Sequence, residues 1–182
     1  MCVYNTKKLR DKKYDAVIYK LQGTYVSIVG QVKEVLPHCD ADNETIPFLY
    51  LIMCCICINI DADYSVLSEY FLSQIEDYSD KDDVLSYIDD RLEKYGAILE
   101  NRKCRGLWLF EKYEFEDPIT CIITTFGDFL VSPSYANDIH HAPLTLIGLS
   151  VREKFSKVMY KTVYPLIGDL AEFIEIFFTR LK

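Results

Sequence analysis

Carboxylates gathered in the middle of the chain dominate the side chains that could carry out chemistry. Residues 38–93 hold fourteen Asp and Glu against two basic residues, Lys81 and Arg91, whereas the whole chain has a net charge of −8. A concentrated negative field steers encounters with basic macromolecules and repels the phosphates of nucleic acid. The candidate partner-binding residues are Asp77, Asp80, Asp82, Asp83, Asp89, Asp90, Glu93 and Glu100.

A helix is expected to position most of these carboxylates. Its apolar side is predicted from alternating spacings of three and four residues, at Leu85, Ile88, Leu92, Tyr95 and Leu99. The same rhythm on the opposite side places an outward row at Asp83, Asp90, Glu93 and Glu100, with Asp89 beside it. This row would be ~25 Å long at 1.5 Å per residue. Asp77, Asp80 and Asp82 extend it into the preceding loop.

Two predicted loops carry side chains that transition metals prefer, namely His38, Cys39, His140 and His141. Four ligands could assemble if the two loops met in space, and the sequence leaves that open. The triplet formed by Cys54, Cys55 and Cys57 has apolar neighbours and no second ligand pair. We therefore expect small buried hydrophobic residues there rather than a metal site.

Cys104 is a candidate reactive thiol. Cys104 stands between Lys103 and Arg105, and neighbouring cations lower the pKa of a thiol. A nucleophile also needs a base and an oxyanion hole, and the sequence shows neither. It also lacks the nucleotide-binding, hydrolase and metalloprotease motifs, which favours a protein that is not an enzyme. No cofactor or metal is expected.

Apolar spacing and proline positions favour a mainly α fold, a single-domain bundle of about seven helices over residues 1–182, with a basic arm at 1–13. Residues 48–60 are apolar on every side and predict a buried central helix after a loop at 37–46. Asp117 and Pro118 predict a helix start, and Pro165 should separate the last two helices. Residues 14–36 and 107–131 also suit short hairpins, so an α+β fold is the alternative.

Location is predicted from what the chain lacks. The N-terminus has no apolar signal-peptide core, and the seven Cys show no framework spacing. The longest uncharged run, 45–60, is shorter than the ~20 residues of a spanning helix. We therefore expect a cytoplasmic protein that neither enters a membrane nor binds nucleic acid directly.

These features favour a non-catalytic acidic binding protein that inhibits a basic nucleic-acid-processing partner, such as a nuclease. By composition rather than by any shared motif, the class includes phage or mobile-element anti-defence inhibitors (anti-CRISPR or anti-restriction proteins) and nuclease immunity proteins. One alternative is a helical structural scaffold in which the terminal helices form a homodimer. Another is a metalloprotein or enzyme that uses the His and Cys side chains of the loops.

Overall fold

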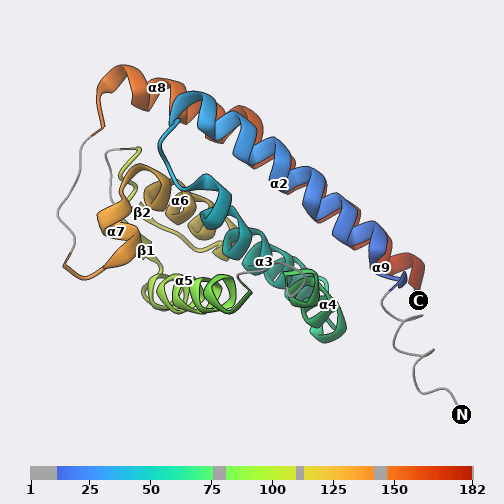
Figure 1. Ribbon diagram of the computed structural model, residues 1–182. Coiled ribbons are helices and arrows are strands. Elements are labelled where there is room, and N and C mark those ends of the chain that lie inside the picture. Colours follow the sequence, from blue (N-terminus) through green and yellow to red (C-terminus); the bar gives the residue numbers. More distant parts are fainter. Residues whose placement is uncertain (1–11, 76–80, 110–112, 142–146, 182) are drawn as a thin grey trace, which may run out of the picture.

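The computed structural model describes residues 12–75, 81–109, 113–141 and 147–181, and it is mainly α-helical (Figure 1). Its elements are α2 (Asp15–Val35), α3 (Ala41–Asn59), α4 (Ser65–Ile75), α5 (Lys81–Asn101), β1 (Lys103–Cys104), β2 (Tyr113–Glu114), α6 (Pro118–Val131), α7 (Pro133–Asn137), α8 (Leu149–Val158), a π-helical turn η1 (Met159–Val163) and α9 (Tyr164–Leu181). Most of the predicted basic arm lies outside the described residues.

The prediction of a mainly α bundle is confirmed, and the hairpin alternative is wrong. Residues 15–35 form one helix, α2, and most of 107–131 belongs to α6. Strand pairing among the described residues is confined to two residues on each side, with Lys103 opposite Glu114 and Cys104 opposite Tyr113. Most β-branched residues of α2 and α6 are buried in the core, and packing of this kind overrides a weak strand preference.

One layer of the molecule consists of α2 packed antiparallel to α8, η1 and α9 (Figure 1). The predicted break at Pro165 is wrong, because α8, η1 and α9 follow one another without interruption. The backbone N–H of Tyr164 bonds to the carbonyl of Met159, five residues back. This wider turn lies directly before Pro165, where a normal α-turn would bring the proline ring against a carbonyl.

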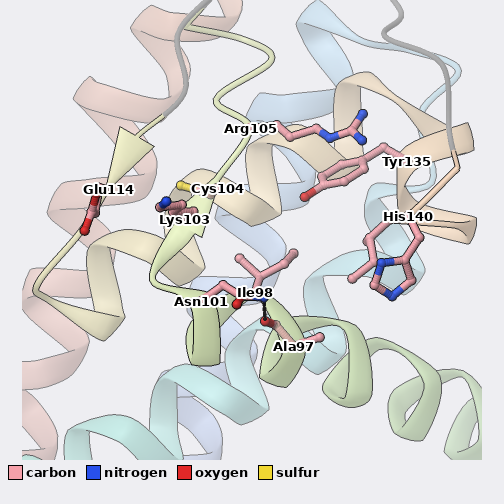
Figure 2. A pocket seen from close by; sticks show the side chains of 10 residues that line it. Ala97, Ile98, Asn101, Lys103, Cys104, Arg105, Glu114, Tyr135 and His140 are labelled. Carbon is pink, nitrogen blue, oxygen red and sulfur yellow. Dashed lines mark hydrogen bonds between the residues drawn. The ribbon is translucent and has the colours of Figure 1, made fainter.

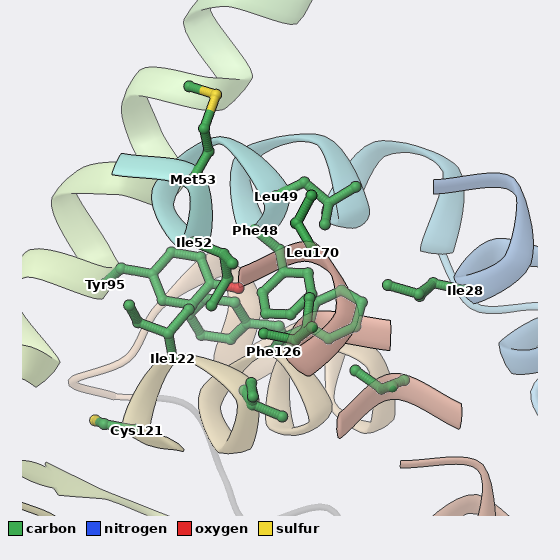
Figure 3. Packing of buried hydrophobic residues seen from close by; sticks show 14 of the residues in the cluster. Ile28, Phe48, Leu49, Ile52, Met53, Tyr95, Cys121, Ile122, Phe126 and Leu170 are labelled. Carbon is green, nitrogen blue, oxygen red and sulfur yellow. The ribbon is translucent and has the colours of Figure 1, made fainter. Parts of the chain in front are cut away.

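The second layer is built around α3 and α6. The rings of Phe48 and Phe126 stack with centroids 4.0 Å apart, and Tyr95, Ile122 and Leu170 lie close to them (Figure 3). The buried central helix is confirmed, but α3 begins at Ala41, seven residues before the predicted stretch 48–60, because Pro47 is accommodated inside the helix. Part of the loop predicted at 37–46 is therefore helical.

Helix α6 begins where the sequence predicts. Asp117 is its N-cap and accepts hydrogen bonds from the backbone N–H of Ile119 at 3.2 Å and the hydroxyl of Thr120 at 2.7 Å. Along α6, Gly127 allows the indole of Trp108 to lie against the backbone, since an added Cβ would be 2.4 Å from the indole nitrogen. That nitrogen donates to the carbonyl of Thr124 at 3.0 Å. This close approach ties the segment after β1 to the core.

Candidate functional site

The outward face of α5 carries most of the predicted partner-binding residues. Its buried side consists of Ile88, Arg91, Tyr95 and Ile98, so the apolar stripe is rotated from the predicted one and includes a charged residue. Leu85, Leu92 and Leu99 are only half-buried. Figure 1 shows α5 on the side of α3 and α6 that faces away from α2. Its exposed face is therefore not covered by the α2–α9 layer.

Four exposed carboxylates lie directly opposite the buried stripe: Asp82, Asp89, Glu93 and Glu100. Their spacings of seven, four and seven residues keep them within one narrow strip along ~27 Å of helix. We call this strip the acidic row. The prediction centred the row on Asp83 and Asp90, which are exposed beside it. Asp77 and Asp80 lie outside the described residues.

Asp90 differs from the other carboxylates of α5, because it is already paired. It accepts hydrogen bonds from the ammonium of Lys94 at 2.6 Å and from Nη1 of Arg91 at 2.7 Å. Partial burial opposes its ionisation, but the hydrogen bond from Lys94 and the two positive charges outweigh that effect and hold the pKa of Asp90 below its usual value. Asp90 therefore offers less negative charge to a partner than the acidic row does.

Arg91 is buried and forms an ion pair that the sequence did not predict. Its side chain is 5% exposed, and it contacts the carboxylate of Glu44 on α3 through Nε at 2.9 and 3.1 Å and through Nη2 at 2.8 Å. The guanidinium also lies 4.6 Å from the ring centroid of Tyr87. The burial of Arg91 could have been suspected from its position, because it falls between Ile88 and Tyr95 on the buried side of the helix.

The two cations of α5 that the structure describes are thus neutralised by their own neighbours. Glu44 balances Arg91 inside the protein, and Asp90 holds Lys94, whose side chain is 15% exposed. Within the described residues, no salt bridge involves the four carboxylates of the acidic row. Among the described side chains of α5, which do not include that of Lys81, no cation is left to compensate the negative charge that this helix face directs to solvent.

The loop side chains considered as metal ligands do not form a site in the described part of the chain. His38, His140 and His141 are exposed and Cys39 is half-buried. No group of three or more His, Cys, Asp or Glu side chains among the described residues is placed to hold a metal ion. Asp138 accepts hydrogen bonds from the backbone N–H groups of His140 and His141 at 3.0 and 3.1 Å, which gives it a local structural role.

The cysteines behave mainly as buried side chains. Cys54 and Cys57 are buried on α3, and burial raises their pKa values to about 11 and about 12. Cys104 is 2% exposed, and its hydrogen bond with Cys121, together with burial, raises its pKa instead of lowering it. The pKa of Cys121 is lowered by the same hydrogen bond. Lys103 and Arg105, next to Cys104 in sequence, therefore do not lower the pKa of its thiol.

Comparison with known proteins identifies no relative: no family model matches the chain, and neither does any curated protein or solved structure. Within the described residues, α3 is the one helix long and apolar enough to cross a membrane. However, 61% of its most apolar window is buried inside the protein. Its packing against α6 explains the apolar composition of the helix.

Proposed function

We propose that this chain is a non-catalytic binding protein that uses the acidic row of α5 to engage a basic, nucleic-acid-processing protein in the cytoplasm and inhibits it by competing with nucleic acid. The observation that carries this proposal is the arrangement of charge on α5. Four carboxylates point to solvent along one strip, while Arg91 and Lys94 are held by Glu44 and Asp90.

The physical consequence of this arrangement is faster encounter with a positively charged surface. Oppositely charged patches raise association rates by on the order of tenfold or more, and salt screens the effect beyond ~10 Å. The row is sparser than a nucleic-acid duplex, which carries one negative charge per ~1.7 Å of its axis. The row would therefore steer and orient the partner, and binding energy would come mainly from apolar contacts near it.

A charge-matched pair of variants tests this proposal. The first, D82N/D89N/E93Q/E100Q, neutralises the acidic row. The second, E153Q/D169N/E172Q/E175Q, neutralises four exposed carboxylates on α8 and α9. Both change the net charge by four, from −8 to −4, so any difference between them reports position rather than total charge.

The assay is capture of cellular proteins on immobilised chain, followed by measurement of the association rate of the captured protein at low and high salt. The proposal expects a basic protein that is released by salt or by duplex DNA, is lost with the row variant and is kept by the control variant. Capture that is equal for both variants and insensitive to salt would refute it. Thermal unfolding of both variants checks that the fold is intact.

A second candidate function, an oligomeric scaffold, is favoured by the outer face of α2. Tyr19 and Val26 are seven residues apart on this face and are 70% and 66% exposed. A Cβ added at Gly23 or Gly30 would meet nothing within 4 Å, so the face is uncovered in the monomer. Sedimentation analysis of wild-type protein and Val26→Asp distinguishes the candidates. A dimer that the substitution dissociates would support the scaffold.

A further inference from the structure

A cavity of about 500 Å³ lies where the C-terminal turn of α5 meets β1 and α7 (Figure 2). The cavity shares no lining residue with the acidic row. Its walls combine apolar side chains with cations and with hydroxyl and thiol groups. The lining residues used below are Ile98, Lys103, Cys104, Arg105, Tyr135 and Ile139. A volume in this range is typical of sites for small organic molecules, which occupy ~300–1,000 Å³.

Tyr135 is the polar group that points to a ligand. Its side chain is 3% exposed, and Figure 2 shows its hydroxyl directed into the space near Ile98 and Cys104. Among the described residues, this hydroxyl has no hydrogen-bond partner, and burial raises the pKa of Tyr135, so it remains a donor. A hydroxyl that faces a cavity and has no protein partner is costly unless water or a ligand accepts its hydrogen bond.

The ring of Tyr135 is fixed in place by its neighbours. The guanidinium of Arg105 lies 5.0 Å from its centroid, and the ring of Phe129 lies 5.5 Å away. The segment that carries Arg105 is anchored in turn, because the buried carboxyl of Asp128 accepts hydrogen bonds from the backbone N–H of Gly106 at 2.9 Å and of Leu107 at 2.6 Å. The hydroxyl is therefore held in position before any ligand arrives, which reduces the entropy lost on binding.

Charge at the cavity favours an anion. Lys103 and Arg105, two residues apart, place two cationic side chains on the lining, and Glu114, opposite Lys103 in the hairpin, places one carboxylate there; Arg105 also interacts with other groups, so Lys103 is the cation tested below. Burial raises the pKa of the nearby Asp128 to about 8, which disfavours a negative charge on this carboxyl. The apolar part of the lining lies at Ile98 and Ile139.

We propose that this cavity binds a small organic anion, a carboxylate or a phosphate monoester with an apolar body. Its anionic group accepts the hydrogen bond from Tyr135 and faces Lys103 and Arg105, while its body packs against Ile98 and Ile139. This site is independent of the acidic row, so the chain could respond to a metabolite of this class in addition to binding a protein.

The test uses anilinonaphthalene sulfonate, an apolar anion whose fluorescence rises in a dry cavity. The proposal expects saturable binding at one site in the folded protein, with displacement by phenyl phosphate or benzoate but not by benzyl alcohol. Tyr135→Phe removes only the hydroxyl and should weaken binding about tenfold, as expected for one hydrogen bond to a charged group. Lys103→Gln, at an exposed position, should weaken binding several-fold without affecting folding.

The matched control is Lys161→Gln, which removes an exposed cation from η1 and should leave binding unchanged. If Lys103→Gln and Tyr135→Phe bind the probe as the wild type does, the proposal is overturned. It is also overturned if benzyl alcohol competes as well as benzoate, or if binding does not saturate. Circular dichroism of each variant separates loss of the site from loss of the fold.

Discussion

Removing one partner of the buried ion pair between Glu44 and Arg91 should destabilise the protein more than any surface change on α5. The two side chains are 3% and 5% exposed and make three contacts between 2.8 and 3.1 Å. Desolvation works against the charge of Arg91, but the hydrogen bond and the charge of Glu44 outweigh it and raise the pKa of the guanidinium. Glu44 left alone would be an uncompensated buried charge, and Arg91 left alone would keep only the half-exposed Asp90 as a charged partner.

The magnitude follows from that loss of compensation. Breaking a buried pair on one side costs about 3–5 kcal/mol, whereas replacing both members by uncharged groups of similar size is much less costly. We therefore expect Arg91→Met and Glu44→Gln each to lower the free energy of unfolding by about 3 kcal/mol or more. The double variant should be less destabilised than the sum of the two single variants, by ~2 kcal/mol or more.

The assay is urea unfolding followed by far-ultraviolet circular dichroism, with the four proteins of the double-mutant cycle compared under one condition. Asp90→Asn provides the control, because it removes a partner that is 48% exposed and should cost ~1 kcal/mol or less. Additive effects of the two single substitutions would refute the reasoning, as would a cost for Arg91→Met no larger than that of the control. Either result would mean that the pair does not stabilise the docking of α5 onto α3.

Three further predictions concern the core. Gly127→Ala should lower the free energy of unfolding by about 1–3 kcal/mol and shift the emission of the single tryptophan, because its Cβ would lie 2.4 Å from the indole nitrogen of Trp108. Burial outweighs the backbone hydrogen bonds of Asp128 and raises its pKa from 3.8 to about 8, so the contribution of Asp128 to stability should be complete below pH 3.8 and be lost as the pH rises toward 8. The urea midpoint of the wild type should depend on pH across that range in a way that the midpoint of Asp128→Asn does not. Cys54 and Cys57, with raised pKa values and buried thiols, should react with a thiol reagent only on unfolding, as mass spectrometry of labelled protein would show.

The sequence predicted those parts of the fold in which the local pattern and the tertiary packing agree. The helix start at Asp117 depends on a capping carboxylate next to a proline, and both are local features. The break at Pro165 was wrong because η1 accommodates the proline, and a change of hydrogen-bond register by one residue leaves no mark in the apolar spacing. The early start of α3 was not predicted for a similar reason. Proline is common in the first turn of a helix, so the sequence pattern indicates a start at Pro47, although this residue lies inside the helix.

The site was predicted only in part. Exposure of the carboxylates on α5 follows from their spacing and is confirmed for those that the structure describes. The burial of Arg91 could not be predicted, because its partner, Glu44, is 47 residues away along the chain. The same holds for the cavity, which combines Ile98, Lys103 and Tyr135 from three separate elements. Pairings of this kind depend on tertiary packing rather than on local periodicity.

The inward placement of Arg91 bears on why the acidic row exists. If the charges of an exposed helix face served only solubility, the most stable helix would alternate acids and bases on that face. Opposite charges four residues apart would then attract each other. On α5 Asp90 and Lys94 form one such pair, but within the acidic row Asp89 and Glu93 are four residues apart with like charge, and Arg91 binds Glu44 instead. Such repulsion costs a few tenths of a kcal/mol and brings no benefit to the isolated fold. This like-charge spacing within the acidic row supports the proposal of a basic partner, because contact with cations would relieve the repulsion.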